Sequence, residues 1–496
     1  MSGRDIIRAG AAQGCRPWER HLLTVEQWTA LVTLPTPPLA GMWADQTHVH
    51  AAFHGEGELL LASIAVAGGR FPALSPQRPP AAWFERMIRD LWGHEAAGGT
   101  DQRPWLDHGR WTVTAPMAAR PGPGPEAPPQ PEFLPAEGDS LHVVPVGPVH
   151  AGTIEPGHFR FHAQGETVAR LEVRLGYTHK GTLSLMRGRS PRAAAAFAAR
   201  ISGDSTVAHS IAFARAAEAA AGAEAPPRAH ALRAVMAEVE RIANHLGDIG
   251  AICNDAAFAP PHARTGYHRE ILLRAAATAF GHRLMMDCVI PGGVADDIAP
   301  GGEVTLLQTL AAIEHEFPAL LRMYDDYASL ADRVSGTGIT DPALVERFAA
   351  GGVVGRAAGR GFDARQDLRY PPYDVLLPGT PLHLTGDVDA RVRVRMEEVG
   401  VSIRLLRTLL ARLPDGPLVA PLPQVAGEGV GVAEGFRGDV LHWVRTDSGG
   451  LIDAVFARDP AWFHWPLIEA LIEGNIVADF PLCNKSVNGA YSGVDL

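Results

Sequence analysis

A proline-rich segment divides this chain of 496 residues into a short N-terminal part and a long C-terminal part. Pro116–Glu137 reads PMAARPGPGPEAPPQPEFLPAE, carries eight prolines and shows no apolar periodicity. Such a composition favours extended polyproline conformations and is typical of a spacer. We therefore expect an N-terminal domain over 1–115, a linker over 116–138 and a second domain over 139–496.

The two parts differ in their hydrophobic pattern. In the N-terminal part, 48–66 predicts two short strands around a Gly-Glu-Gly turn, and 81–92 predicts a helix with one apolar face. The C-terminal part opens with strand-like alternation over 142–148 and 158–175 and is then mainly helical, most clearly over 229–253. The expected fold class is α+β: a small α+β domain, followed by a mainly α-helical domain that opens with a small β-sheet.

Charge and cysteine content exclude several classes of protein. The net charge is −11 and no block of Lys or Arg stands out, which argues against nucleic acid or an anionic membrane surface as the main partner. The four cysteines, Cys15, Cys253, Cys288 and Cys483, are scattered, as in proteins of a reducing compartment. No apolar run approaches the ~18 residues of a membrane span, so any membrane contact is expected to come through other subunits.

Common catalytic and nucleotide-binding motifs are absent, including GxGxxG before a helix, the P-loop, HExxH and GxSxG. NAD is therefore not expected on this chain. Three local clusters of polar residues remain, at 147–158, 200–210 and 479–486. By themselves, a lone histidine in a turn and a lone cysteine are more often structural than catalytic.

A series of short motifs gives the clusters a context. In chain order they are GPVH (147–150), EPGHFRF (155–161), GYTHKG (176–181), EVERIANHL (238–246), GHRLMMD (281–287), PGGV (291–294), EGFRG (434–438) and RDPAWFH (458–464). In this order, over about Leu141–Leu496, they resemble the large subunit of membrane-bound [NiFe] hydrogenases of the formate hydrogenlyase type, and the forty-nine-kilodalton subunit of respiratory complex I. WFERMIRDLWG (83–93) and DQRPWLDHGRW (101–111) resemble the thirty-kilodalton subunit of complex I. Fusion of the two units is the arrangement of formate hydrogenlyase.

The resemblance also indicates where this chain departs from the hydrogenases. Their metal pair is held by two CxxC pairs, which fall here on Ser202 with Ser205 and on Cys483 with Ser486. Nickel and iron require soft thiolate ligands, and a serine hydroxyl is a poor, protonated ligand near neutral pH. We therefore expect no metal on this chain and no hydrogenase activity, and we expect these four positions to line a cavity for a quinone.

The resemblance does not reproduce the quinone ligands of complex I. His150 matches the first histidine of the complex I hairpin pattern, but the histidine that binds quinone falls on Ile154, and no tyrosine lies near Ser202. One interpretation is a modified site that uses His150, Asp204 and His209, each able to exchange or orient protons. The other is that these residues hydrogen-bond the former cavity shut.

Two further residues complete the candidate site. Glu155 occupies the hairpin glutamate of the hydrogenase-type members, where a buried carboxyl with a raised pKa could relay protons. Alternatively, Glu155 forms a salt bridge to an arginine such as Arg437. By the resemblance, Arg437 in EGFRG lies close to the active site.

The resemblance implies an oxidoreductase subunit at the cytoplasmic face of a bacterial membrane. Electrons would come from Fe–S clusters in a small partner subunit, similar to the twenty-kilodalton subunit of complex I, and reduce a quinone, while antiporter-like membrane subunits translocate ions. No cofactor is expected on the chain itself. A non-catalytic coupling or scaffold subunit is the alternative, and a [NiFe] hydrogenase with altered ligation is a third hypothesis.

Overall fold

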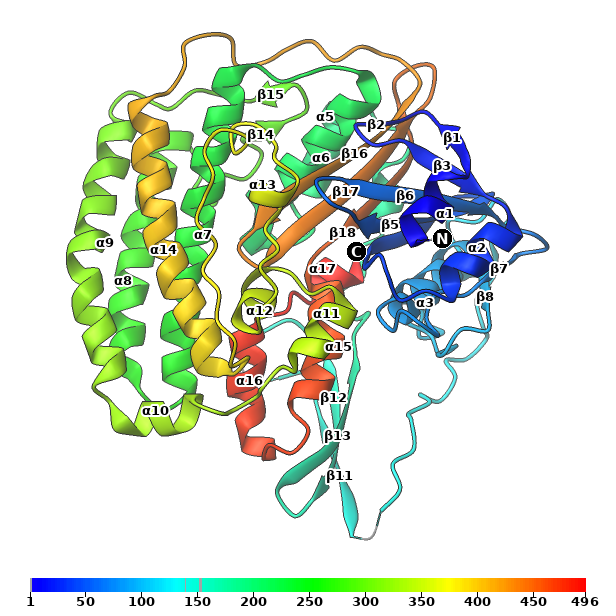
Figure 1. The fold of residues 1–496 in the computed structure, drawn as a ribbon, viewed down its shortest axis with the longest axis horizontal. Helices are drawn as coiled ribbons and strands as arrows, with labels where there is room; N and C mark the ends of the chain where they lie inside the picture. The colour runs from blue at the N-terminus through cyan, green and yellow to red at the C-terminus, as the bar shows by residue number, and fades with distance from the viewer. Residues whose placement is uncertain (1, 139, 151–153) are drawn as a thin grey trace.

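The computed structural model describes residues 2–138, 140–150 and 154–496 and shows an α+β fold (Figure 1). The N-terminal part holds a five-stranded sheet in the order β1 (Ala11–Gln13), β3 (Arg20–Leu23), β6 (Leu59–Ala65), β5 (His48–His54) and β4 (Leu39–Ala44). Strands β5 and β6 pair antiparallel, which confirms the hairpin predicted over 48–66. The same part contains α1 (Gly3–Arg8), α2 (Val25–Val32), α3 (Ala81–Trp92) and the short pair β7 (Arg70–Pro72) and β8 (Glu95–Ala97).

The N-terminal part also contributes to a sheet of the C-terminal part. β2 (Cys15–Arg16) adds a parallel strand to β16 (Gly427–Gly435), giving the order β18-β17-β16-β2 with β17 (Gly438–Thr446) and β18 (Ile452–Arg458). Two ion pairs, Arg20–Glu428 and Arg445–Asp45, cross the same junction. The two parts are thus joined by a shared sheet as well as by the linker.

The proline-rich linker lies against the protein surface. After the short pair β9 (Val113–Thr114) and β10 (Gly122–Pro123), the Phe133 ring lies 4.5 Å from the Arg160 guanidinium. The Leu134 amide donates a hydrogen bond to the Glu172 carboxylate, and the Pro135 carbonyl accepts one from Arg170. These contacts fix the end of the linker on a sheet of the C-terminal part.

That sheet is the antiparallel meander β11 (Leu141–Val146), β12 (His158–Gln164) and β13 (Thr167–Arg174), which projects from the body of the molecule (Figure 1). It confirms the strands expected over 142–148 and 158–175. The loop between β11 and β12 carries two of the predicted site residues, and its residues 151–153 lie outside the described part of the chain.

Helices form most of the remaining C-terminal part. They are α4 (Thr182–Met186), α5 (Pro191–Ala198), α6 (Thr206–Ala221), α7 (Pro227–Asp255), α8 (Ala259–Phe280), α9 (Gly302–Asp325), α10 (Ala328–Val334), α11 (Pro342–Phe348), α12 (Gly352–Ala357), α13 (Ala364–Asp367), α14 (Val388–Ala411), α15 (Ala461–Leu471), α16 (Phe480–Val487) and α17 (Ser492–Asp495), with the short strands β14 (Val289–Ile290) and β15 (Gly293–Val294). The long helices α7, α8, α9 and α14 pack side by side (Figure 1). α7 confirms the helix predicted over 229–253.

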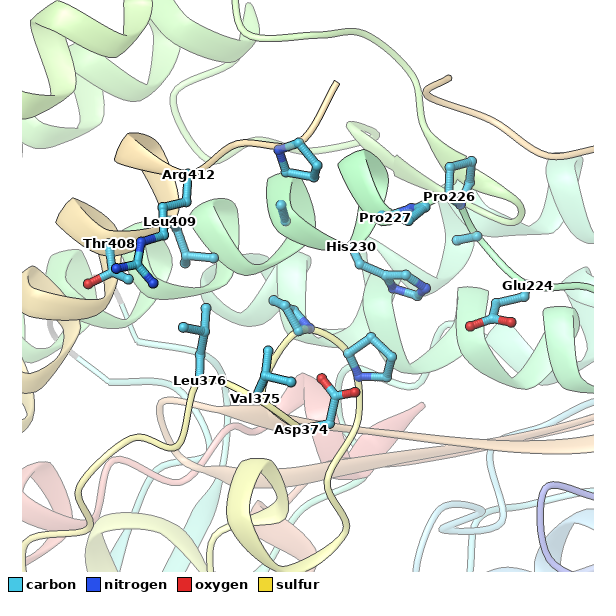
Figure 2. A pocket seen from close by; sticks show the side chains of 15 residues that line it. Glu224, Pro226, Pro227, His230, Asp374, Val375, Leu376, Thr408, Leu409 and Arg412 are labelled. Atoms are coloured by element: carbon cyan, nitrogen blue, oxygen red, sulfur yellow. The ribbon is translucent and has the colours of Figure 1, made fainter. Parts of the chain in front are cut away.

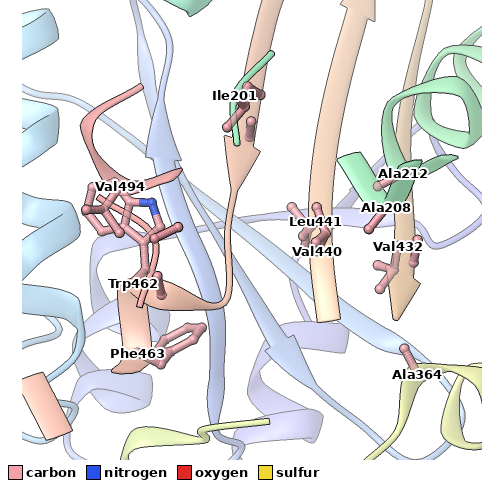
Figure 3. Close-up of a cluster of buried hydrophobic side chains, with 14 of the residues drawn as sticks. Ile201, Ala208, Ala212, Ala364, Val432, Val440, Leu441, Trp462, Phe463 and Val494 are labelled. Atoms are coloured by element: carbon pink, nitrogen blue, oxygen red, sulfur yellow. The ribbon is translucent and has the colours of Figure 1, made fainter. Parts of the chain in front are cut away.

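Helix α6 packs unusually closely on strand β16. A Cβ atom at Gly429 would lie 2.2 Å from the Ala216 carbonyl oxygen, and one at Gly431 would lie 2.1 Å from that of Ala212. Glycine is therefore required on this face of the strand, and alanines cover the facing side of the helix. Figure 3 shows part of the resulting core, with Ala212 close to Val432. This packing holds the start of α6, and the residues just before it, at the candidate site.

Candidate functional site

The first predicted ligand pair lies immediately before α6. Ser202 has extended backbone angles, and Gly203–Ser205 form a single 3₁₀ turn that leads into the helix. The Ser202 hydroxyl donates a hydrogen bond of 2.8 Å to Asp204 Oδ1. The Asn244 side chain on α7 donates to the Asp204 carbonyl oxygen at 2.8 Å and fixes this turn from the other side.

Arg437 forms a two-point ion pair with Asp204. Its Nη1 lies 2.7 Å from Asp204 Oδ1 and its Nη2 lies 2.5 Å from Oδ2, while Nη1 also donates to the Ser205 hydroxyl at 3.0 Å. Burial alone would raise the pKa of Asp204, but the charge and hydrogen bonds of Arg437 outweigh burial and hold that pKa well below its ordinary value. Asp204 is therefore ionised throughout the physiological range.

The second predicted pair, Cys483 and Ser486, lies on α16. The Ser486 hydroxyl donates to the Cys483 carbonyl oxygen at 2.7 Å and accepts from Arg391 Nε at 2.9 Å. Burial raises the pKa of the Cys483 thiol to about 11, so the thiol is protonated near neutral pH. Arg391 comes from α14 and donates its other hydrogen bonds to uncharged oxygens, including the Gly338 carbonyl.

One arginine connects the two pairs. Arg437 Nε donates to the Asn488 carbonyl oxygen, two residues after Ser486, at 2.5 Å. The Asn488 side chain in turn donates to Asp248, which also accepts from Lys485 at 3.0 Å. Arg437 thus links the first predicted pair to the segment just after the second pair.

The arrangement does not fit a nickel–iron pair. Both serine hydroxyls of the first pair are engaged with Asp204 and Arg437, and a guanidinium cation lies against Ser205. In the second pair the only thiol is protonated, and a second guanidinium, from Arg391, contacts Ser486. Within the described ranges, no three His, Cys, Asp or Glu side chains are grouped so that they could hold a metal ion. Soft, anionic ligands are what a nickel site needs, and this site offers hydroxyls and cations.

The four positions predicted to line a cavity are buried in the described structure. Ser202, Ser205, Cys483 and Ser486 are each at most 3% exposed. Among the pockets that open on the part of the chain that the structure describes, five have volumes of about 220 to 730 Å³, and none of these five is lined by any of the four residues. In the isolated chain, the three serine hydroxyls form hydrogen bonds with Asp204, Arg437, Arg391 and the Cys483 carbonyl.

His209 lies on α6, one turn beyond the first pair, and is fully buried. Its Nε2 is 3.0 Å from Asp459 Oδ2, and its Nδ1 is 3.1 Å from His442 Nε2. Burial alone would raise the pKa of Asp459, but its hydrogen bond with His209 outweighs burial, and the pKa is lowered. The ionised carboxylate therefore accepts a hydrogen bond from His209 Nε2. The sequence identified His209 but not its two partners, because His442 and Asp459 lie 233 and 250 positions further along the chain.

His150 and Glu155 lie apart from the ion pair. His150 Nε2 donates to the Gly157 carbonyl oxygen at 2.8 Å, which closes the loop between β11 and β12. The Glu155 carboxylate accepts from the Ser492 amide at 2.9 Å. The carboxylate partner of Arg437 is Asp204, so the alternative salt bridge between Glu155 and Arg437 is wrong for the described structure.

One buried carboxyl that was not among the predicted site residues contacts the start of α6, just after Asp204 and Ser205. Glu240 on α7 accepts hydrogen bonds from the Val207 and Ala208 amides at 2.7 and 3.1 Å, at the start of α6. Burial and the nearby Asp204 charge raise the pKa of Glu240 to about 8, despite those two hydrogen bonds. Glu240 can therefore gain or lose a proton near neutral pH, which is the property expected of a proton-transfer group.

Comparison with known proteins places this geometry in a family. Residues 258–428 match the model "Respiratory-chain NADH dehydrogenase, 49 Kd subunit", and residues 180–247 match "Nickel-dependent hydrogenase". Formate hydrogenlyase subunit 5 of Escherichia coli (strain K12) is 30% identical over 439 residues, covering 86% of this chain and 77% of that protein. This chain belongs to the family of group 4 hydrogenase and complex I large subunits. The resemblance inferred from the sequence motifs is confirmed.

Two further relatives and one solved structure are also similar to this chain. Hydrogenase-4 component G of the same organism is 29% identical, covering 86% of this chain and 76% of that protein. NADH-quinone oxidoreductase subunit 4 of Thermus thermophilus is 25% identical, covering 71% and 93%. A subunit of an archaeal membrane-bound sulfane sulfur reductase shares the fold, with a TM-score of 0.68 at 23% identity, over 72% of this chain and 99% of that one. Family members are oxidoreductase subunits of membrane-bound complexes. In the described residues, no helix has the length and apolar character needed to cross a bilayer.

Proposed function

We propose that this chain is the large subunit of a membrane-associated, complex I-like oxidoreductase that does not use hydrogen. It receives electrons from the Fe–S clusters of a small partner subunit and passes them to a quinone-type acceptor, and this transfer drives ion translocation by antiporter-like membrane subunits. The chain lies on the cytoplasmic face and holds no redox cofactor of its own. The observation that carries the proposal is the Asp204–Arg437 ion pair across the former metal-ligand positions.

The groups at this ion pair suit a carbonyl acceptor better than a metal. A guanidinium and two serine hydroxyls are hydrogen-bond donors, and donors of this kind stabilise the negative charge that develops on a quinone oxygen during reduction. Complete reduction takes two electrons, supplied by the partner's clusters, and two protons. Glu240, whose pKa is about 8, lies one hydrogen-bonded turn from Asp204 and can pass protons toward that site.

Access of the acceptor requires the ion pair to open. Asp204 retains 37% side-chain exposure, whereas Arg437 is 5% exposed, so the carboxylate is the group that can turn outward. Once Asp204 moves, Arg437 and Ser205 lose a hydrogen-bond acceptor that a quinone oxygen can replace.

One observation favours a second candidate function, a coupling subunit without redox chemistry of its own. The former ligand positions are buried and satisfy one another's hydrogen bonds, as expected of a site that serves only to hold the fold together. In that case the buried charges of α7 and α14 would transmit movement between subunits, while the acceptor would bind elsewhere in the complex.

Reoxidation of the partner's Fe–S clusters distinguishes the two candidates. The purified complex is reduced, a short-chain quinone is added, and the decay of the reduced Fe–S signal is followed. The proposal predicts fast reoxidation that Arg437→Met slows at least ~10-fold, as for loss of one charge-stabilising donor. The matched control is Arg200→Met, which removes the exposed ion pair to Asp287 and leaves the rate unchanged. Reoxidation that Arg437→Met does not affect would favour the coupling subunit.

A further inference from the structure

A continuous network of charged side chains is buried in the C-terminal part and contains none of the predicted site residues. Its members come from α7, α12, α14, β16 and α13 with its N-cap. They are Glu238, Arg241, His245, Arg356, Asp363, Arg365, Glu398 and Glu434, joined by contacts of 2.7 to 3.4 Å. Each is at most 2% exposed, and none lines the cavity of about 730 Å³ between the first turn of α7 and the last turn of α14 (Figure 2).

The charges of this network do not balance if every carboxyl group is ionised. Three arginines face four carboxyl groups, so one negative charge is in excess, and the network is shielded from solvent. An uncompensated charge is unfavourable in such surroundings, and a titratable group there usually changes its protonation state instead. A single proton, on a carboxyl or on the histidine, restores the balance.

The ionisable groups around the network do not remove the excess charge. Those near Glu434 are Asp439, Arg360 and Tyr370, and those near His245 include Arg395. Asp439 is paired with Arg458, and Arg395 is paired with Asp248. Arg360 lies among the carboxylates of Asp439, Glu346 and Asp367, so its charge is shared.

Glu434 has the fewest ionic partners of the four carboxyl groups. Within the described residues, it contacts one arginine, Arg356, at 3.1 Å, and its other oxygen accepts from the Ala364 amide at 2.9 Å. The carboxyl groups that each contact two arginines are those of Glu238, Asp363 and Glu398. Burial and the nearby Asp363 charge raise the pKa of Glu434 to about 7.

His245 is less suited to carry the proton. Its Nε2 lies 2.7 Å from Glu398 Oε2, but burial and the charges of Arg395 and Arg241 lower the pKa of the imidazole despite that contact. An imidazolium also donates from both nitrogens, and in the described structure the buried Nδ1 meets no acceptor. The neutral form needs only the contact to Glu398.

We propose that Glu434 is a buried proton-storage site, which carries one proton near neutral pH because its network holds one carboxyl group too many. Glu434 lies three residues before Arg437, at the end of β16. Helix α12, which carries Arg356, packs against the same turn, since a Cβ atom at Gly352 would lie 1.9 Å from the Arg437 carbonyl oxygen. Gain or loss of this proton therefore changes the charge close to the candidate site. The proposal does not depend on the proposed function.

Infrared difference spectra of the purified full chain, between about pH 6 and about pH 8.5, test the proposal. The carbonyl band of a protonated carboxyl group disappears when the group ionises, as a pKa of about 7 predicts for Glu434 in this range. In Glu434→Gln, the difference band should fall by the amplitude of one carboxyl group. Asp363→Asn should cause a similar fall although Glu434 is still present, because three carboxylates then balance three arginines.

The matched control is Glu428→Gln, on the same strand, where pairing with Arg20 lowers the pKa of a buried carboxyl. Because Glu428 is ionised throughout the range, its replacement should leave the band unchanged. Glu240 and Glu469 also titrate in this range and contribute to every spectrum. An unchanged band in Glu434→Gln would overturn the proposal, and so would an unchanged band in Asp363→Asn. Melting temperatures identify any variant that does not fold, and the other variant then decides.

Discussion

Arg437 and Asp204 meet through two hydrogen-bonded contacts, Nη1 to Oδ1 at 2.7 Å and Nη2 to Oδ2 at 2.5 Å. Asp204 stands between Ser202 and Ser205, the two serines that the resemblance to hydrogenases predicts at the first metal-ligand pair, and Arg437 also contacts Ser205. One cation and one anion thus balance each other here. A metal pair would instead need several negatively charged thiolates.

Removing the anion of this pair will destabilise the fold. Asp204→Asn leaves the buried Arg437 guanidinium without its counter-ion, and we expect a loss of about 1–3 kcal/mol. This lies below the ~3–5 kcal/mol of a fully buried pair because Asp204 keeps 37% exposure. Urea denaturation measures the change. Asp287→Asn, which breaks the exposed pair with Arg200, serves as the control and should cost at most ~1 kcal/mol. Equal costs for the two variants would contradict the prediction.

Glu240 predicts a specific dependence of stability on pH. Its pKa in the fold is about 8, above the value of about 4.3 in an unfolded chain. Because the fold favours the protonated carboxyl, its contribution to stability is complete below the pKa of the unfolded chain. That contribution falls as the pH rises and is lost as the pH passes through about 8. Between pH 5.5 and 7.5 we expect the wild-type chain to lose about 2–3 kcal/mol more than Glu240→Gln. Denaturation at the two pH values measures this, and identical losses would contradict it.

Cys483 is expected to be chemically inert in the folded chain. Its thiol is buried and its pKa is about 11, so very little thiolate exists at pH 8. Alkylation by iodoacetamide, followed by mass spectrometry, should modify Cys483 at least ~100-fold more slowly than a free thiol of pKa about 8.5. Unfolding in urea should restore the ordinary rate. Rapid modification of the native chain would show that the second ligand pair is more open than described.

The contact between α6 and β16 predicts a large effect of one methyl group. Gly431→Ala places a Cβ atom 2.1 Å from the Ala212 carbonyl oxygen, so helix and strand must separate. We expect a loss of about 2–4 kcal/mol, at the upper end of the cost of overpacking. Gly266→Ala on α8 is the matched control, because its Cβ meets no atom within 4 Å. That control should gain about 0.5–1 kcal/mol from helix propensity. A loss at Gly431 below ~1 kcal/mol would not be compatible with the close packing.

The sequence correctly predicted the helices and strands in which the spacing of apolar residues matches the side of the element that is buried. The helix expected over 229–253 is found as α7, and the strands expected over 48–66 and 158–175 are found as β5, β6, β12 and β13. It missed β16–β18, which lie in the part of the chain that the pattern predicts to be mainly helical. The glycine-rich run GEGVGVAEG of β16 has the composition of a loop. Its glycines are required by the close approach of α6, a helix far earlier in the chain, which no local pattern reveals.

The candidate site shows the same limit. Motif resemblance located Ser202, Ser205, Cys483 and Ser486, but the residues that determine their chemistry come from distant elements. Arg391 reaches Ser486 from α14, and Asp459 reaches His209 from beyond β18. Asp204 and Arg437 were both selected from the sequence, yet their ion pair spans 233 positions and appears only in the folded chain.

The nickel content of the purified complex tests the central claim most directly. If the serines, Arg437 and Arg391 stand in the place of a metal site, as we propose, elemental analysis should find far less than one nickel per chain, and the complex should not oxidise hydrogen. About one nickel per chain, retained after chelation and lost in Cys483→Ala, would contradict this account and show that the site binds metal with altered ligands.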